Sequence, residues 1–237
     1  MPQLIDAIVC PICLSPCKLS FTIADEQKTD WIFCNCRCIF HMNKVDKSIF
    51  DEEYHKKVLD FKALPERCEY LMRQYLPIVR ELTYGRKFLD VGYGFDYHLV
   101  NLKKDGWITN GIDLLNHGYI CDDFETHDFK ANRFDFILMS RVLECFHNPI
   151  KALYKAKELL AINGVLLIIT PDSELVYERG MFEFGNWNPT DKSVIFSELQ
   201  LKKVLETLGF KVILSRKDTE RRGLGWNHVH VMVQNIK

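Results

Sequence analysis

Short apolar runs alternate with amphipathic stretches along the chain from residue 86 onward. The apolar runs predict strands at 87–91, 107–112, 134–139 and 165–170. The amphipathic stretches predict helices at 97–104, 150–161 and 197–208. Two more apolar runs, at 211–215 and 229–233, predict a closing pair of strands. This order predicts an α/β fold with a mostly parallel sheet covered by helices on both faces and one antiparallel terminal strand.

Two segments precede this pattern. Residues 55–84 carry apolar side chains near a period of 3.6, which predicts a helical linker or cap. Residues 1–54 predict a separate small module with strands at 18–23 and 30–33, joined by a polar turn at 25–29. So short a module needs a covalent or metal staple. The predicted domains are therefore 1–54, 55–84 and 85–237.

Composition and charge narrow the class of protein. Of 237 residues, 47% are hydrophobic and 27% charged, as in ordinary globular proteins. The formal net charge of −1 creates no field that attracts nucleic acid or anionic membranes. No apolar stretch approaches the roughly 20 residues that span a bilayer, and the first residues lack the pattern of a signal peptide. We therefore expect a cytoplasmic protein without membrane association.

Nine cysteines are distributed unevenly, and six of them fall between Cys10 and Cys38. In a protein without a signal peptide, such a cluster indicates a metal site in a reducing compartment more than a set of disulfides. The cysteine module, residues 1–54, is therefore expected to hold its fold through a bound metal ion.

The spacing of the cysteines resembles a zinc ribbon. Cys10 and Cys13 form a first knuckle, and Cys34, Cys36 and Cys38 follow at every second position. Structural zinc takes four ligands, so the first pair would be joined by two of the later three. Which two is left open by the sequence. Two other side chains could substitute as ligands, Cys17 and His41.

A glycine-containing turn follows the first predicted strand. The strand at 87–91 leads into Gly92 and Gly94, and the next strand ends in Asp113, about 20 residues further on. Nucleoside-binding α/β folds use this spacing, because glycines let the backbone approach a ligand and an acid at the second strand end can accept hydrogen bonds from both ribose hydroxyls.

Six segments in order make the comparison specific. They are 89–94, 111–114, 122–124, 134–144, 159–171 and 196–210. Together they resemble the signature of class I S-adenosylmethionine-dependent methyltransferases, from the glycine-containing donor loop to the "F-S-x-x-x-L…G-F" helix and strand. The resemblance implies a Rossmann-like, doubly wound sheet of seven strands and an enzyme that uses S-adenosylmethionine.

The resemblance also assigns binding residues. By resemblance, Asp90 and the glycine turn line the methionine end of the donor, Asp113 the ribose, and Asp123 the adenine. The implied cofactor-binding set is Asp90, Gly92, Tyr93, Gly94, Asp113, Leu114, Asp123, Phe124, Ser140, Arg141 and Val142.

The chain departs from the family pattern at three places. Asp96 stands where a third glycine is usual, and an acid at a helix start disfavours a pyrophosphate, which supports S-adenosylmethionine over NAD. Cys145 replaces the histidine that usually follows Glu144, and residues 162–164 replace Pro-Gly-Gly.

The catalytic residues are less well defined by the sequence. Methyl transfer is a displacement that positioning accelerates, and a base is needed only when the acceptor atom must lose a proton. Candidate catalytic residues are His147, before a predicted helix, and Tyr177, in an aromatic insertion at 172–192 that we expect to cover the acceptor; Glu144 is also expected near the methyl group.

Three functions remain open from the sequence. The favoured one is methyl transfer to a small-molecule acceptor, such as a sugar or other metabolite. A rival is RNA methylation with the ribbon gripping RNA, but residues 1–54 contain five Lys and Arg against eight Asp and Glu, which suits phosphate binding poorly. Nucleic acid is therefore a less favoured partner. A third hypothesis is a donor-binding module that has lost catalysis.

Overall fold

The structure is a computed structural model of the whole chain. It describes residues 8–17, 21–22, 30–41, 45–58, 64–115, 117–130, 133–179, 191–218 and 228–236. The predicted turn at 25–29 lies outside the described residues, as does most of the predicted aromatic insertion, from residue 180 to residue 190.

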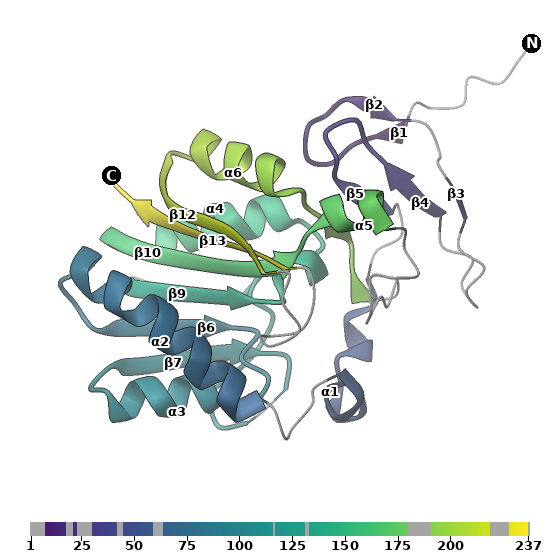
Figure 1. Cartoon of the computed structure of the whole chain (residues 1–237). Helices are drawn as coiled ribbons and strands as arrows, with labels where there is room; N and C mark the ends of the chain where they lie inside the picture. Colours follow the sequence, from purple (N-terminus) through teal and green to yellow (C-terminus); the bar gives the residue numbers. More distant parts are fainter. Residues whose placement is uncertain are drawn as a thin grey trace, which may run out of the picture.

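A seven-stranded sheet forms the centre of the protein (Figure 1). Its strands are β6 (Lys87–Val91), β7 (Ile108–Asp113), β8 (Ile120–Cys121), β9 (Phe134–Ser140), β10 (Leu160–Pro171), β12 (Phe210–Asp218) and β13 (His228–Asn235). The order is β12-β13-β10-β9-β6-β7-β8, and only β13 runs antiparallel to its neighbours β10 and β12. The predicted mostly parallel sheet with an antiparallel terminal strand is confirmed.

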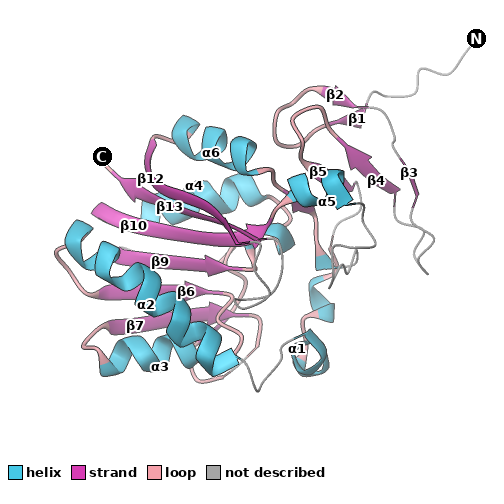
Figure 2. Ribbon diagram, in the orientation of Figure 1, coloured by secondary structure: helices cyan, strands magenta, loops and turns pink. Residues whose placement is uncertain are grey.

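Helices cover both faces of this sheet (Figure 2). On one face α2 (Leu64–Leu82) and α3 (Tyr97–Lys104) bury apolar side chains such as Leu71, Tyr75 and Leu99. On the other face lie α4 (Pro149–Leu159) and α6 (Glu198–Thr207). Burial of these stripes supplies most of the stabilisation, because helical stability in proteins comes mainly from packing of an amphipathic face.

The junction between α4 and β10 differs from the prediction. The helix was expected to reach residue 161, yet it ends at Leu159 and β10 begins at once at Leu160. Pairing with β9 shifts register between Leu160 and Val165. Asn163 has φ 63°, and a Cβ on Gly164 would lie 2.9 Å from the backbone oxygen of Phe134. The irregular turn at 161–164 therefore lies within β10 as a break in its pairing with β9.

The cysteine module forms small antiparallel sheets, one of which includes a strand of the large domain, residues 85–237. β1 (Ile8–Val9) pairs with β2 (Pro16–Cys17). β3 (Phe21–Thr22), β4 (Asp30–Phe33) and β5 (Ile39–His41) form a second sheet, and β11 (Val194–Ile195) adds to its edge by pairing with β5. Trp31 and Ile39 pack with Ile195 and Val176 in one buried cluster. The module and the large domain therefore share both a sheet and a core.

Short helices connect these parts. η1 (Lys47–Ile49) and α1 (Glu52–Val58) follow the cysteine module, and α1 crosses the domain boundary expected at residue 54. η2 (Leu143–Cys145) follows β9, and α5 (Ser173–Arg179) follows β10. Figure 1 shows α1, α5 and the cysteine module beyond the carboxyl ends of the parallel strands. Among the described helices, none is long and apolar enough to cross a membrane.

Candidate functional site: a two-part cavity at the carboxyl ends of the parallel strands

Two adjoining cavities lie at the carboxyl ends of β6, β7 and β9. The first has about 650 Å³ of space and the second about 920 Å³, partly open to solvent. Residues common to both walls are Tyr54, His55, Gly92, Arg141 and Cys145. The two cavities therefore meet beside the glycine turn, in the position where open parallel sheets bind ligands.

The glycine turn after β6 brings the backbone to the cavity wall. Gly92 and Gly94 have φ values of 69° and 54°, a region that other residues seldom adopt. The amide of Gly92 donates to the carbonyl of Ile112 at 2.8 Å. A Cβ added at Gly92 would lie 2.7 Å from Cγ2 of Val142. Both the backbone conformation and the packing therefore require glycine at residue 92.

Asp113 is held in the wall of the first cavity. Its Oδ2 accepts from the Gly94 amide at 2.9 Å and its Oδ1 from the Leu115 amide at 3.0 Å. The residue is 9% exposed. Each carboxylate oxygen retains a second lone pair, so the group can accept further bonds from vicinal hydroxyls in the cavity. Leu114 lines the same wall.

Asp90 lies in the wall of the second cavity, and no described residue forms an ion pair with it. The residue is 1% exposed, and its Oδ2 has no hydrogen-bond partner among the described residues. Burial, and next the charge of Asp113, raise the pKa of Asp90 well above its usual value. A buried carboxyl of this kind is costly unless a cation approaches it. Tyr93 and Gly94 line the same cavity.

The far end of the first cavity is apolar and acidic. Phe124 packs against the rings of Phe129 and Phe146, with centroids 5.8 and 5.7 Å apart. Asp123 lines the cavity beside it and pairs with Lys47. A planar ring would find an aromatic wall and a carboxylate together here.

Lys47 links this end of the cavity to the segment before α1. Its Nζ lies 2.5 Å from Oδ2 of Asp123 and 2.6 Å from Oε2 of Glu125. Burial alone would lower the pKa of Lys47, but the bonds to these two carboxylates outweigh it and raise the pKa. The lysine therefore stays charged and secures η1 against the loop after β8.

The strand end of β9 forms the floor where the cavities meet. Ser140 lines the second cavity, Val142 the first and Arg141 both. Arg141 has φ 59°, and its amide donates to the carbonyl of Ile169 at 2.7 Å. The sequence predicted these three residues together, and the structure places all three at the cavity floor.

A group of charged residues lies next to this floor. Tyr54 donates its hydroxyl to Oδ2 of Asp191 at 2.6 Å, and Lys192 pairs with the same carboxylate. Glu144 accepts from Oγ1 of Thr170 at 2.9 Å. Burial raises the pKa of Glu144, although the charge of Lys192 opposes that rise. Tyr54, Glu144 and Lys192 all line the second cavity.

The two residues predicted to be catalytic lie elsewhere. Nε2 of His147 lies 2.7 Å from the carbonyl oxygen of Val45, and Tyr177 donates its hydroxyl to the carbonyl of Cys34 at 3.0 Å. Neither side chain lines either cavity. Because each polar group is engaged by main chain of the N-terminal segment, the geometry gives both residues a packing role rather than a place beside the methyl group.

Several cavity residues were not anticipated. They are Lys47, Tyr54, His55, Arg67 and Lys192. The first three lie on η1 and α1 and Arg67 on α2, so they precede the glycine turn in sequence. The predicted helical segment at 55–84 included His55 and Arg67 but carried no signal for which face meets the cavity, and Lys192 was expected only as the end of the insertion at 172–192.

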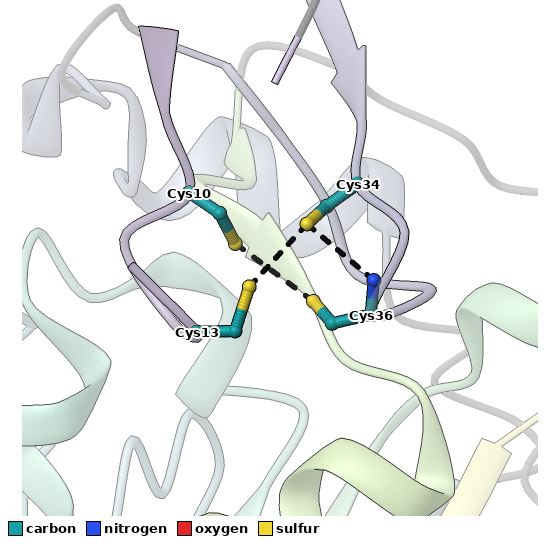
Figure 3. Close-up of side chains that lie close together, drawn as sticks. All are labelled: Cys10, Cys13, Cys34 and Cys36. Carbon is teal, nitrogen blue, oxygen red and sulfur yellow. Dashed lines mark hydrogen bonds between the residues drawn. The ribbon is translucent and has the colours of Figure 1, made fainter. Parts of the chain in front are cut away.

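Four cysteine sulfurs converge in the N-terminal module (Figure 3). Cys10 and Cys13 lie after β1, and Cys34 and Cys36 lie between β4 and β5. All four Sγ atoms lie within 4.8 Å of one another, with 3.8 Å from Cys10 to Cys36 and 3.5 Å from Cys13 to Cys34. Four Zn–S bonds of about 2.3 Å in a tetrahedron place sulfurs roughly 3.8 Å apart.

The other candidate ligands are outside this group. Cys38 is buried, but its thiol is not among the four that converge. Its carbonyl accepts from the Cys34 amide at 3.0 Å, which closes the turn. Nε2 of His41 contacts the carbonyl of Lys192, and the Cys17 thiol donates to the carbonyl of Ser15. The geometry therefore selects Cys34 and Cys36 from the three that the sequence left open.

Main-chain carbonyls of the second knuckle are held by the large domain. The carbonyl of Cys36 accepts from Oγ of Ser197 at 3.2 Å, and that of Arg37 accepts from Oγ of Ser173 at 2.5 Å. The Arg37 guanidinium makes two bonds to the carboxylate of Glu174. The knuckle is thereby fixed against α5 and the start of α6.

Comparison with known proteins assigns the family. A family model described as a methyltransferase domain matches residues 63–215. The chain belongs to this methyltransferase family. The match begins in the linker before α2 and ends in β12, so it contains the glycine turn, Asp113 and the floor of both cavities.

Solved structures show the same fold. The 1,6-didemethyltoxoflavin-N1-methyltransferase of Burkholderia thailandensis, with bound S-adenosylhomocysteine, gives a TM-score of 0.63 at 15% identity over 92% of this chain and 100% of that one. Magnesium protoporphyrin IX methyltransferase from Synechocystis, also with S-adenosylhomocysteine, gives 0.59 at 12% identity over 79% and 97%. By family and by fold, this chain is a class I S-adenosylmethionine-dependent methyltransferase.

Sequence relatives include parts of much larger proteins. The probable polyketide synthase 8/35 of Dictyostelium discoideum is 32% identical over 125 residues, which is 48% of this chain and 5% of that protein. The chain thus spans about a twentieth of the length of that relative.

Proposed function

We propose that this methyltransferase binds S-adenosylmethionine across both cavities and transfers its methyl group to a small-molecule acceptor, a sugar or other metabolite. The proposal of a donor site depends on two acids near the ends of the adjacent strands β6 and β7. Asp113 offers carboxylate oxygens to the first cavity, and Asp90 brings to the second a buried carboxyl whose Oδ2 has no partner among the described residues.

The residues present fit this donor. The ammonium of its methionine end supplies the cation that Asp90 lacks, and its ribose hydroxyls suit the free lone pairs of Asp113. Phe124 and Asp123 suit the adenine ring and its amino group. Arg67 lines the methionine end and could pair with the carboxylate there. When bound, the donor supplies an electrophilic methyl group on sulfur.

The polar lining of the second cavity supports a small acceptor. Tyr54, Lys192 and Glu144 bring hydrogen-bonding and charged groups to the second cavity, where an acceptor would approach the methyl group. The names of the similar proteins refer to 1,6-didemethyltoxoflavin, to magnesium protoporphyrin IX and to polyketide synthesis, which are small-molecule substrates or products. These names support the class of acceptor that we propose.

The charge of the described ribbon argues against RNA. Arg37 is bonded to Glu174, and Lys47 to Asp123 and Glu125. Cations that are already paired release few counterions on binding phosphates. The described part of the ribbon therefore offers little of the phosphate affinity on which an RNA-gripping module depends.

We further propose that Cys10, Cys13, Cys34 and Cys36 hold one structural zinc ion. Their sulfur spacing suits tetrahedral thiolate coordination. Four protein ligands leave no position for substrate, so the ion would stabilise the module and take no part in methyl transfer.

Calorimetry and product analysis test the function. Titration with S-adenosylmethionine should show one donor site per chain, and the protein incubated with donor and a panel of sugars, phenols and β-ketoacyl thioesters should release S-adenosylhomocysteine. Absence of donor binding at millimolar concentration would rule out the enzyme. Methylation of RNA, with affinity that falls steeply with salt, in preference to every small molecule would support the rival.

A further inference from the structure

His55 lies where the two cavities meet. It is one of the few residues that line both, and only 9% of its surface is exposed. Its ring contacts Phe95 edge to face, with centroids 6.2 Å apart, and Tyr54 at 5.5 Å. The imidazole is therefore fixed over the shared part of the cavity and is not a solvated surface group.

One hydrogen bond defines the tautomer of this imidazole. Nδ1 of His55 lies 2.8 Å from the carbonyl oxygen of Asp51, which immediately precedes α1. A carbonyl oxygen only accepts hydrogen bonds, so Nδ1 carries the proton. In the neutral ring Nε2 is then unprotonated, with its lone pair available. No described residue is a hydrogen-bond partner of Nε2, which leaves this nitrogen available to a ligand.

This inference rests on the proposed function, which places the reacting methyl group close to Nε2. In the donor, the sulfonium joins the ribose to the methionine chain. Asp113 lines the first cavity, where the ribose is proposed to bind, and Asp90 lines the second, where the methionine end is proposed to bind. The sulfonium and its methyl group therefore belong at the junction of the two, beside His55.

We propose that His55 is the general base of the reaction and that the acceptor reacts through an atom that must lose a proton, a hydroxyl oxygen, an acidic carbon or a protonated nitrogen. The acceptor's X–H bond breaks and its proton passes to Nε2. The electron pair left on X forms the bond to the methyl carbon, while the pair of the broken S–C bond stays on sulfur. The imidazolium then returns its proton to solvent.

The other candidates for this proton fit less well. His98 also lines the second cavity, but burial lowers its pKa to about 4, so it is a weak base. Burial and the charge of Asp191 raise the pKa of Tyr54, which keeps that hydroxyl protonated. Glu144 has one carboxylate oxygen engaged by Thr170. His55 has both the free lone pair and the position.

Charged groups on the surrounding elements set the environment of the imidazole. Those that line the same cavities are Lys47, Arg67, Asp90, Asp113, Asp122, Asp123, Arg141, Glu144 and Lys192. Asp51 contacts His55 through its carbonyl, and its side chain caps α1 by accepting from the Tyr54 amide. Both signs of charge therefore surround the imidazole in the cavity walls.

Chemical modification tests the position without knowledge of the acceptor. The wild-type protein is treated with diethyl pyrocarbonate, with and without saturating S-adenosylhomocysteine, and modified peptides are identified by mass spectrometry. His55 should react in the free protein and be protected at least tenfold by the ligand. His127 serves as the reference, because it lines neither cavity although its ring pairs with Asp122 at the rim of the first.

Turnover tests the chemical role. With an acceptor that the panel identifies, His55→Gln should lower kcat by about 100-fold or more, leave the Kd of S-adenosylmethionine within about threefold, and remove the rise of kcat with pH. Thermal melting of the variant should show that its fold is preserved. His127→Gln should match wild type.

The outcomes separate this inference from the proposed function. Ligand binding by calorimetry without protection of His55, or an unchanged kcat in His55→Gln, would overturn the role of His55 alone. Absence of any ligand binding would overturn the donor site and the base together. Protection combined with the loss of kcat would establish His55 as the base.

Discussion

Lys47 and Asp123 form an ion pair that joins the N-terminal segment to the far end of the first cavity, with 2.5 Å between Nζ and Oδ2. Lys47 belongs to η1, and α1 with Tyr54 and His55 follows directly. Glu125 contributes a second bond to the same ammonium. The pair therefore secures the segment that covers the cavity.

Lys47→Ala should weaken donor binding. The change leaves Glu125, whose side chain is 9% exposed, without its cation and loosens the segment over the cavity. We expect the Kd of S-adenosylmethionine to rise about tenfold, which corresponds to about 1.4 kcal/mol, as measured by calorimetry. Lys56→Ala is the matched control, because its pair with Glu52 on α1 is exposed. Equal effects of the two changes would contradict this role.

Asp113→Asn should impair both the turn and the donor. Asn has a single oxygen, so one of the amides of Gly94 and Leu115 would lose its acceptor. We expect the Kd of S-adenosylmethionine to rise at least tenfold and thermal stability to fall by a few degrees, in keeping with the loss of about 1–3 kcal/mol. Asp128→Asn, at an exposed acid beyond the cavity, should leave the Kd unchanged. An unaltered Kd in Asp113→Asn would remove the ribose assignment.

Asp90→Asn should have effects of opposite sign on stability and on binding. The folded pKa of Asp90 lies above the unfolded value of 3.8, so the free protein loses stability as pH rises from 3.8 through the raised pKa. The amide avoids this penalty. The melting temperature of the variant, relative to that of wild type, should be higher at pH 7 than at pH 4. Calorimetry should show at least tenfold weaker donor binding. A variant that is destabilised at pH 7 yet binds normally would refute both parts.

Metal content should distinguish Cys36 from Cys38. Cys36→Ser removes a thiol from the group of four and should reduce bound zinc from about one ion per chain to well below half. Cys38→Ser changes a neighbouring buried thiol outside the group and should retain zinc. Atomic absorption of the purified proteins measures both. Zinc loss in Cys38→Ser with retention in Cys36→Ser would mean that the knuckle uses a different pair.

Tyr177→Phe should affect the docking of the knuckle and leave catalysis intact. The change removes the hydroxyl that donates to Cys34 but keeps the ring against Phe33 and under Arg37. A lost hydrogen bond of this kind costs about 0.5–1.5 kcal/mol, which thermal melting detects. We expect kcat within about twofold of wild type. A loss of kcat by orders of magnitude without a change in melting would restore Tyr177 as a catalytic residue.

The residues of the proposed donor site could be predicted from the sequence, because the order of strands in a parallel sheet fixes which ends meet. Asp90, Asp113 and Ser140 each fall at or near the carboxyl end of a predicted strand, and parallel strands bring these ends to one edge of the sheet. The predicted strands therefore placed them at one edge, and the family resemblance singled out Asp90 and Ser140 there.

The residues beside the proposed acceptor could not be predicted in the same way. Tyr54 meets Asp191 although 137 residues separate them, and His147 was expected at the cavity but contacts Val45. No local pattern encodes which face of α1 turns inward, because packing against the large domain decides it. The base that we propose is therefore His55 and not His147.

The sequence determined the elements and the cysteine knuckles, because each depends on neighbours within a few residues. The alternation of strands and helices then implied the mostly parallel sheet. Only the tertiary structure decided that β11 joins the sheet of the cysteine module, that Cys34 and Cys36 accompany the first knuckle, and that α1 covers the junction of the cavities. These contacts join segments far apart in the sequence, and their energies depend on side-chain packing across the whole fold.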